Sequence, residues 1–382
     1  MIPMKKFFAL ILALVMALSL VACGDSGTTA PSTGGSSAEG GDTSGEKIAL
    51  VTDVGTIDDE SFNQGTWEGV EEYAKANGIE YVYYQPSADS TDARLTSIGQ
   101  AAKEGATVIV MPGYLFGEAL LTAPEQYPDV KFIAIDVNPD ADMGGQTPAS
   151  NLHCIYFAEE QPGYLAGYAA VKEGYTQLGF LGGMAVPAVV RYGQGYVQGA
   201  SAAAEELGTD ISIKYTYGGQ FFGDANITAK MEGWYQAGTE VVFACGGGIY
   251  TSAVEAALNN NGYVIGVDTD QHYLGEKEEY AYNPFVTSAM KALSESTKSA
   301  LDTYFAGEWD TIGGTAANLG LQQGDFVGLP TAEASWGFKN FTMDDYNAVV
   351  EKIKSGEITI DNNSSADTHV EVGAHTTVEY ID

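Results

Sequence analysis

Short apolar runs alternate with stretches of helical periodicity from residue 46 onwards, and this alternation constrains the fold more than any other feature. Apolar runs of about five residues, separated by helices of about 10–15 residues, are typical of βαβ units and parallel sheets. The best helix candidates are residues 63–77, 92–104, 188–207 and 250–260. The expected strands are residues 48–52, 81–84, 107–111, 132–136, 177–181, 211–215, 240–244 and 263–267.

These strands are too many for one ordinary open sheet, so the sequence predicts an α/β protein with two doubly wound, Rossmann-like lobes. A further apolar run at residues 285–290 leads into an amphipathic stretch, residues 291–305. We expect the chain to cross between the lobes near residues 157, 288 and 319, which makes a three-crossing hinge. The N-terminal lobe would comprise residues 47–156 and 288–318, and the C-terminal lobe residues 157–287 and 319–382. No function follows from the acidic stretch 361–382.

The first 46 residues read as a targeting segment followed by a tether. Lys5 and Lys6 precede an apolar run, residues 7–22, which has the length of a signal-peptide core. The end of this run, Leu20-Val21-Ala22-Cys23, resembles the lipobox of bacterial lipoproteins. This resemblance implies that residues 1–22 are a signal peptide and that Cys23 carries the lipid, palmitate included. A plain secretory signal or a short anchor helix is the alternative.

Residues 23–46 are dominated by Gly, Ser and Thr and contain no large apolar side chain. Such a segment cannot bury enough surface to offset its chain entropy, so we expect a flexible tether. Each version of the N-terminus places the body outside the cytoplasm. With a lipid on Cys23, the protein would lie on the extracytoplasmic face of the cell membrane.

The charge balance excludes several classes of partner. Among 382 residues, 51 Asp and Glu stand against 17 Lys and Arg, a formal net charge of −34. Nucleic acids and anionic lipid surfaces are bound by clustered Lys and Arg. We therefore expect no nucleic-acid partner, and contact with the membrane only through the N-terminal lipid. The same shortage of cations disfavours a ligand rich in phosphate and favours a neutral or cationic one.

Acidic residues and glycines follow several of the predicted strands. Asp53, Asp136 and Asp268 come at the ends of apolar runs, and three glycines at 246–248 follow the run 240–244. In an open parallel sheet, ligands bind beyond the carboxyl ends of the strands. A single strand-end Asp is more often a helix cap or a turn residue. Three of them beside a glycine triplet predict a polar binding cleft.

Motifs of catalysis are missing from the sequence. It contains no Gly-x-Ser-x-Gly elbow, no His-Glu-x-x-His and no Gly-x-x-x-x-Gly-Lys-[Ser/Thr] phosphate loop. The pattern Gly193-x-Gly195-x-x-x-Gly199 is only loosely similar to a dinucleotide fingerprint, because it lies inside a predicted helix. Asp58 and Asp59 are adjacent and would point apart in a turn, which disfavours acid–base chemistry. We expect no enzyme, no catalytic residue and no cofactor.

Histidines and cysteines give equally little material for a metal site. The four histidines, none of them at a spacing typical of metal ligands, are His153, His272, His369 and His375. We therefore expect no metal. Cys154 and Cys245 fit either a disulfide in an oxidising compartment or two buried thiols, and the sequence leaves both possibilities open.

The segment Ile-Ala-Leu-Val-Thr-Asp-Val-Gly-Thr-Ile-Asp-Asp-Glu-Ser-Phe-Asn, residues 48–63, resembles the opening of the basic membrane protein family. Similarity extends over about residues 47–305. It includes Trp67-Glu68-Gly69, Asp136, Gly163-Tyr164-Leu165-Ala166-Gly167, Gly182-Gly183-Met184, Gly246-Gly247 and Thr287-Ser288-Ala289-Met290-Lys291. Members of this family are lipoprotein substrate-binding components of ABC importers, and one member type is a purine nucleoside receptor. The resemblance implies a type I periplasmic-binding-protein-like fold and partnership with ABC permease and ATPase subunits.

The resemblance also implies how a nucleoside, in the first place a purine nucleoside, would be held. By position, Phe62 would stack on the base, Asp53 would reach toward the base, and Lys291 would contact the sugar. The second aromatic residue is ambiguous, because Gly219-Gln220-Phe221-Phe222-Gly223-Asp224 departs from the Gly-Ser-Phe-x-Asp pattern of the family, so that either phenylalanine fits. The full expected set is Asp53, Phe62, Asn63, Asp136, Phe221, Phe222, Gly247, Asp268 and Lys291.

Two other functions stay open on the sequence. A receptor for a sugar or a signalling furanose would use the same aromatic and carboxylate chemistry. A ligand sensor would signal through a membrane partner instead of feeding an importer. In each case a ligand that contacts both lobes shifts the hinge toward closure. We expect the protein to act as a monomer.

Overall fold

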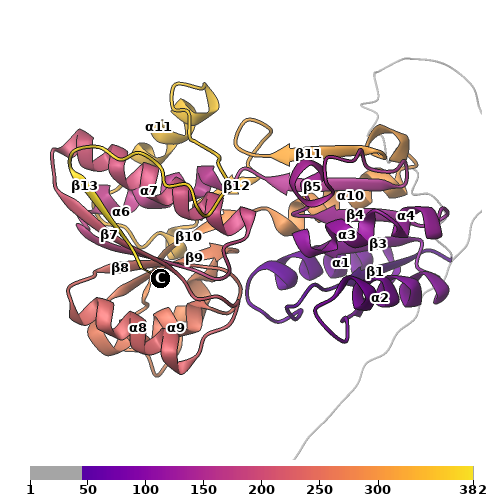
Figure 1. The fold of residues 1–382 in the computed structure, drawn as a ribbon, viewed down its shortest axis with the longest axis horizontal. Coiled ribbons are helices and arrows are strands. Elements are labelled where there is room, and N and C mark those ends of the chain that lie inside the picture. The colour runs from indigo at the N-terminus through magenta and orange to yellow at the C-terminus, as the bar shows by residue number, and fades with distance from the viewer. Residues whose placement is uncertain (1–44, 382) are drawn as a thin grey trace, which may run out of the picture. The chain divides into compact units, whose positions relative to one another are not determined.

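The computed structural model describes residues 45–381, which form two mainly parallel sheets flanked by helices (Figure 1). The predicted signal peptide, Cys23 and residues 23–44 of the predicted tether lie outside the described residues. No helix among residues 45–381 has both the length and the apolar character needed to cross a membrane. The two-lobed α/β fold predicted from the alternation of apolar runs and helices is confirmed.

The first sheet has the strand order β11-β5-β4-β3-β1-β2, and all its neighbours are parallel. Its strands are β1 (Lys47–Val51), β2 (Glu80–Tyr84), β3 (Val108–Pro112), β4 (Lys131–Ile135), β5 (Leu152–Phe157) and β11 (Thr315–Leu319). Its helices are α1 (Phe62–Asn77), α2 (Thr91–Lys103), α3 (Gly117–Leu120), α4 (Ala123–Gln126), α5 (Pro139–Asp142) and α10 (Leu293–Phe305). Alternate strand residues face two apolar clusters, one on each side of the sheet.

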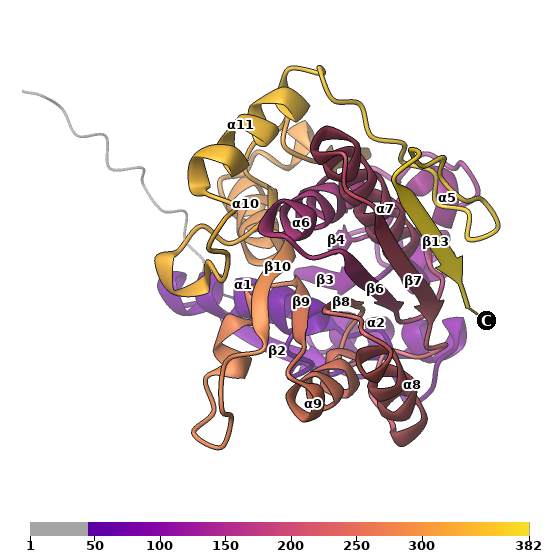
Figure 2. The ribbon, with the colours of Figure 1, turned by 90° about the vertical axis from the view of Figure 1, so that its left-hand side faces the viewer.

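The second sheet has the order β12-β10-β9-β8-β6-β7-β13, in which only β12 runs antiparallel to its neighbour β10. Its strands are β6 (Gln177–Gly182), β7 (Ile211–Tyr217), β8 (Val241–Cys245), β9 (Tyr263–Asp268), β10 (Phe285–Lys291), β12 (Val327–Gly328) and β13 (Thr376–Tyr380). Its helices are α6 (Glu160–Glu173), α7 (Pro187–Leu207), α8 (Ala225–Gln236), α9 (Tyr250–Asn260) and α11 (Met343–Lys354). The yellow strand β13 in Figure 2 adds the acidic C-terminal stretch to the free side of β7.

Helix α6 lacks the periodic signal by which a helix is predicted from sequence. Helix α6 is buried on all sides from Glu160 to Val171, so no polar face produces a period of 3.6 residues.

The chain passes between the sheets after β5, after β10 and after β11. Because β10 continues to Lys291 within the second sheet, position 288, near which a crossing was expected, lies inside that strand.

The glycines of the loose dinucleotide pattern have a structural role in helix packing. Helices α6 and α7 lie against each other (Figure 2), and a side chain on Gly199 would collide with the carbonyl of Tyr164. In the same way, Gly167 of α6 faces the carbonyl of Tyr196 of α7. Gly199 therefore serves the close approach of two helices rather than a phosphate group.

Both sheets share one topology that determines where a ligand binds. Within each sheet the second strand in chain order lies on one side of the first, and the later strands lie on the other side, except that β13 lies beyond β7. The order therefore reverses between β1 and β3 in the first sheet, and between β6 and β8 in the second. Crevices at such reversal points, beyond the carboxyl ends of the strands, are the usual ligand sites of open α/β sheets.

Candidate ligand-binding site

A pocket lies at the carboxyl ends of both sheets and is lined by residues from each. It has about 890 Å³ of space free of protein atoms, the open solvent at its mouth included. Asp53 and Gly113 contribute from the reversal point of the first sheet, and Cys245 with Gly246 from that of the second. The lining residues discussed below are Asp53, Asp59, Phe62, Asn63, Asp136, Asp142, Arg191, Tyr192, Phe221, Gly247, Asp268 and Lys291.

The first wall of the pocket is the turn between β1 and α1. Asp59 accepts hydrogen bonds from the backbone N–H groups of Ser61, Asn63 and Gln64 at 3.0–3.1 Å, and so caps the start of α1. The side-chain amide of Asn63 donates to Asp53 Oδ1 at 2.9 Å and to Asp59 Oδ2 at 3.0 Å. Both amide hydrogens of Asn63 are therefore used within the protein.

Asp53 presents one free oxygen to the pocket. Its Oδ1 accepts from the amide of Asn63 and from the backbone N–H of Gly55 at 2.7 Å. The other oxygen lies against Gly113, where a Cβ would be 2.9 Å from it, and Gly113 has a φ of 121° that favours glycine. Burial raises the pKa of Asp53, while its hydrogen bonds oppose this rise.

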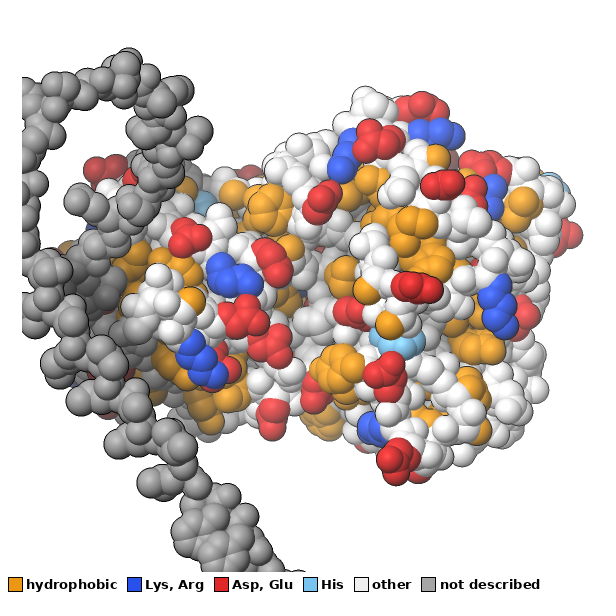
Figure 3. Space-filling view, turned by 180° about the vertical axis from the view of Figure 1, so that it is seen from behind, with side chains coloured by type: hydrophobic (Ala, Val, Ile, Leu, Met, Phe, Trp, Pro, Cys, Tyr) orange, Lys and Arg blue, Asp and Glu red, His pale blue; other side chains and the backbone are white. Residues whose placement is uncertain are grey.

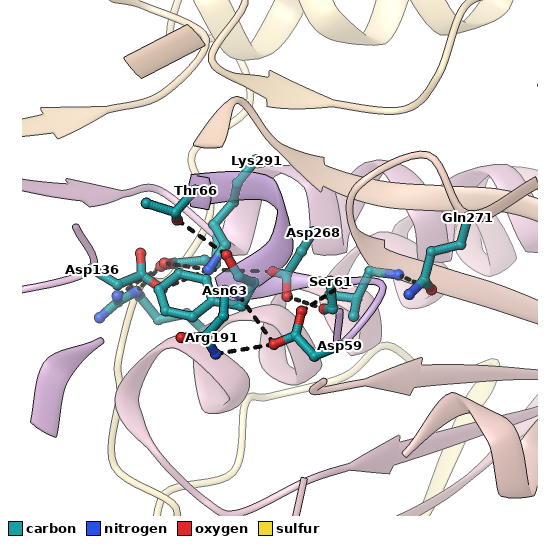
Figure 4. A network of polar contacts seen from close by, with 12 residues as sticks. Asp59, Ser61, Asn63, Thr66, Asp136, Arg191, Asp268, Gln271 and Lys291 are labelled. Carbon is teal, nitrogen blue, oxygen red and sulfur yellow. Dashed lines mark hydrogen bonds and ion pairs between the residues drawn. The ribbon is translucent and has the colours of Figure 1, made fainter. Parts of the chain in front are cut away.

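Lys291, at the end of β10, occupies the centre of a buried ionic cluster (Figure 4). Its Nζ lies 2.6 Å from Asp136 Oδ2, 3.3 Å from Asp268 Oδ1 and 3.9 Å from Glu159 Oε1. The ammonium also lies 4.7 Å from the ring centroid of Phe62. Although burial opposes the charged form, the three carboxylates outweigh it and raise the pKa of Lys291.

Asp136 directly follows β4, and Asp268 is the last residue of β9. Both have a left-handed backbone conformation, with φ of 59° for Asp136 and 65° for Asp268. This conformation is strained for a residue other than glycine and is often found at functional sites. Oδ1 of Asp136 is buried without a hydrogen-bond partner. Oδ2 of Asp268 accepts a 2.6 Å hydrogen bond from the hydroxyl of Ser61, which joins the two lobes.

Arg191 of α7 brings a second cation to the pocket. Its Nε and Nη2 lie 2.7 and 2.6 Å from Oε2 of Glu159, a residue with no exposed surface. Next to it, the hydroxyl of Tyr192 is buried and has no hydrogen-bond partner. Sequence reasoning missed these three residues, because Arg191 and Tyr192 lie within helix α7 and Glu159 follows β5, a strand that was not among those expected.

Two aromatic rings, one from each lobe, line the pocket. Phe62 begins α1, and Phe221 lies in the loop between β7 and α8. A Cβ on Gly183 or Gly246 would come within 2.5 to 2.9 Å of the Phe221 ring, so glycines after β6 and β8 make room for it. Phe222 is 62% exposed and does not line the pocket, unlike the other predicted site residues. The structure thereby distinguishes the two phenylalanines.

The pocket is acidic in spite of its two cations. Its lining includes Asp53, Asp59, Asp136, Asp142 and Asp268, whereas Lys291 and Arg191 are both engaged by carboxylates. Burial raises the pKa of Asp59, Asp136 and Asp142 to about 6 in each case. For Asp136, Lys291 lowers the pKa and Glu159 raises it.

The cysteines and histidines of the described chain form no further centre. Cys154 of β5 and Cys245 of β8 are both buried free thiols in different sheets, so the disulfide alternative is wrong for residues 45–381 as they are described. Burial raises the pKa of Cys154 to about 12, which makes it an inert thiol. Within residues 45–381, no group of His, Cys, Asp and Glu has an arrangement that could hold a metal ion.

Comparison with known proteins shows the family of the chain. Residues 46–364 match the family model described as ABC transporter substrate-binding protein PnrA-like. The chain belongs to this family. The resemblance to basic membrane proteins is thereby confirmed. PnrA-like proteins are substrate-binding components of ABC transporters and work outside the cytoplasm.

Individual relatives of this PnrA-like protein cover most of its length. The ABC transporter nucleoside-binding protein BmpA of Lactococcus lactis subsp. cremoris is 30% identical over 82% of this chain and 88% of its own. Basic membrane protein B of Borreliella burgdorferi is 30% identical over 75% and 81%.

Solved structures support the fold. An ABC transporter solute-binding protein from Aeropyrum pernix K1 superposes with a TM-score of 0.71 at 20% identity, covering 84% of this chain and 95% of its own. A second, from Conexibacter woesei, has a TM-score of 0.65 at 24% identity, covering 83% and 99%. At these identities the similarity concerns the fold alone.

Proposed function

We propose that this protein captures a nucleoside, with a preference for purines, in the pocket between its lobes and delivers it to an ABC importer. The observation that carries the proposal is the presence of Phe62 and Phe221 in one pocket with the Asp136–Lys291–Asp268 cluster. Aromatic rings suit a flat base, since stacking contributes about 1–3 kcal/mol per base. The nucleoside-binding BmpA of Lactococcus lactis supports the same ligand class.

The ionic cluster is suited to the sugar. Ionised carboxylates accept short, strong hydrogen bonds from hydroxyl groups. The buried Oδ1 of Asp136 has no donor in the described chain, so a ribose hydroxyl would satisfy it. We assign Asp53 Oδ2 to a donor on the base, and Asn63 to holding Asp53 in place, because its amide hydrogens are already used.

The charge of the pocket favours nucleosides over nucleotides. A phosphate would meet five aspartates, while Lys291 and Arg191 already have carboxylate partners. The molecular surface has the same character: on the face in Figure 3, Lys and Arg side chains stand singly among Asp and Glu. We expect a nucleoside monophosphate to bind at least tenfold more weakly than its nucleoside, because both cations of the pocket are already paired with carboxylates and the phosphate would face only aspartates.

Binding leads to transport through closure of the lobes. Ser61 of the first lobe bonds Asp268 of the second, and Lys291 bonds Asp136 across the same cleft. A ligand that contacts both lobes binds the closed form more tightly and increases its population. The permease would then recognise the closed protein. No bond is made or broken, and we propose that the protein acts as a monomer because one chain lines the pocket.

Membrane attachment through Cys23 is part of the proposal. Cys23→Ser should abolish incorporation of labelled palmitate, because the side chain that carries the lipid is lost, whereas a plain secretory signal or an anchor helix predicts no palmitate label on the parent protein. Because the binding pocket lies within residues 45–381, the variant should bind ligand like the parent protein.

Calorimetry on the full chain in detergent tests the function. Unfolding and refolding first remove any ligand carried from expression, and adenosine, guanosine, inosine, cytidine, ribose and AMP are then titrated. We expect submicromolar binding of purine nucleosides and little or none of AMP. Binding of ribose with no response to any nucleoside would replace this proposal by a sugar receptor. A nucleotide that binds as tightly as its nucleoside would contradict the electrostatic argument.

A further inference from the structure

The two cations of the pocket share one buried carboxylate. Glu159 has no exposed surface, and its Oε2 holds Nε and Nη2 of Arg191. Its Oε1 has no hydrogen-bond partner and lies 3.9 Å from Nζ of Lys291. Glu159 itself is not part of the pocket lining, whereas Arg191 and Lys291 are.

The position of Glu159 in the chain couples the lobes. It immediately precedes α6, where the chain first passes from the first sheet to the second, and Lys291 ends β10, where the chain passes back. Arg191 belongs to α7 of the second lobe, and Asp136 follows β4 of the first. Glu159 therefore lies at the first chain passage between the lobes and close to Lys291 at the second. Through its contacts with Arg191 and Lys291 it is linked to the ion pairs of the cleft.

The cluster carries more negative than positive charge. Asp136, Glu159 and Asp268 stand against Lys291 and Arg191, and all five side chains are at most 11% exposed. One oxygen of Asp136 and one of Glu159 remain without a donor. Buried carboxylate oxygens without a hydrogen-bond donor are costly, so a ligand hydroxyl or a proton that supplies a donor stabilises the cluster.

We propose that Glu159 is a positioning residue of the ligand site, which fixes Arg191 against the pocket wall and makes the cluster dependent on a donor from the ligand. The proposal rests on the nucleoside function argued above, in which a ribose hydroxyl donates to Asp136. Glu159 acts through Arg191, Lys291 and Asp136 and does not touch the ligand.

The charge of Glu159 also sets how the site responds to pH. The charged groups that face Asp136 are Lys291 of β10, Glu159 before α6, Arg191 of α7 and Asp142 of α5, with Asp268 of β9 on the same ammonium. With a pKa of about 6, Asp136 is mostly ionised at pH 7.5 and mostly protonated at pH 5.5. If the ligand needs the ionised form, its affinity falls a few-fold over this range.

Glu159→Gln tests the proposal against the matched variant Glu160→Gln. Glu160 is the next residue, is also buried, and makes no ion pair within residues 45–381. We expect Glu159→Gln to weaken adenosine binding about tenfold at pH 7.5, since a hydrogen bond between charged groups is lost. It should also lower the pKa of Asp136 and flatten the decrease in affinity toward pH 5.5. Glu160→Gln should change neither, and Glu159→Asp, which keeps the charge, should restore the pH dependence.

The pKa of Asp136 is measured in the ligand-free protein by NMR of selectively labelled aspartate, with Asp136→Asn to assign the signal. This readout does not depend on the ligand, so failure of wild-type protein to bind any nucleoside would remove the proposed function alone. An unchanged Asp136 titration in Glu159→Gln, together with wild-type affinity, would overturn the role of Glu159. Should Glu159→Gln not fold, Glu159→Gln/Arg191→Met leaves no orphan charge. A smaller downward shift of the Asp136 pKa is then expected, because Arg191 lowers this pKa less than Glu159 raises it.

Discussion

Replacement of Phe221 is the sharpest test of the aromatic half of the site. The ring lies over the glycines that follow β6 and β8, lines the pocket, and comes from the lobe opposite to Phe62. Its neighbour Phe222 is 62% exposed and lies outside the pocket. Phe221→Ala and Phe222→Ala change neighbouring residues, but only Phe221→Ala is expected to weaken ligand binding.

The expected magnitude follows from the stacking free energy. Loss of one ring removes about 1–3 kcal/mol per base, which corresponds to an affinity for adenosine that is about 5- to 150-fold weaker. Phe221→Leu separates stacking from simple apolar contact, because leucine still covers Gly183 and Gly246 but has no π face. We expect Phe221→Leu to lose most of the affinity that Phe221→Ala loses, and Phe222→Ala to bind within twofold of wild type.

Calorimetric titration with adenosine, accompanied by thermal unfolding of each variant, decides between the two residues. The unfolding data show whether a weak variant is folded, since Phe221 also contacts the apolar core. Wild-type affinity in both Phe221 variants, with loss in Phe222→Ala, would refute the assignment. Wild-type affinity in Phe221→Leu alone would show that the position needs apolar volume and that the base does not stack there.

Three further predictions concern packing, pH and the ionic cluster. Gly199→Ala should lower the unfolding temperature sharply, since its methyl group meets the backbone of Tyr164. Gly233→Ala, in open space on α8, should stabilise the protein by about 0.5–1 kcal/mol. Equal unfolding temperatures of the two variants would refute the close packing of α6 and α7. The pKa of Asp142 is raised in the folded state to about 6, so its ionisation lowers the free energy of unfolding as pH rises from about 4 to 6. Asp142→Asn removes this cost. In denaturant unfolding we expect the variant to gain about 1–2 kcal/mol in the free energy of unfolding at pH 7.5 and about half of that at pH 5. An equal gain at both pH values would contradict this linkage. Asp268→Ala should weaken nucleoside binding at least tenfold in calorimetry with unchanged far-UV circular dichroism, and undiminished affinity would remove Asp268 from the site.

Sequence reasoning succeeded where the signal is local. Strands β1, β4 and β9 are short apolar runs, and the residues that follow or end them, Asp53, Asp136 and Asp268, are read directly from the chain. The topology rule for parallel sheets then places such residues at one edge. The family resemblance added Phe62 and Lys291, whose roles no periodicity reveals. These predictions needed only the order of residues along the chain.

Other features have no local signal. Helix α6 was not predicted because burial on all sides removes the polar face that produces a helical period. Phe221 and Phe222 are adjacent phenylalanines, and only the position of the loop against Gly183 and Gly246 places the first in the pocket.

The order of residues along the chain is enough to predict two α/β lobes, a polar cleft at the strand ends and the residue types available there. Which of these side chains meet depends on the packing in three dimensions. Arg191 pairs with Glu159 across 32 residues, Lys291 with Asp136 across 155, and Ser61 with Asp268 across 207. Such pairs depend on the packing of helices and strands that are remote in the chain, and in this buried setting an unpaired charge would be costly. The three-dimensional arrangement therefore determines which carboxylates are already occupied and which oxygen atoms remain free for a ligand.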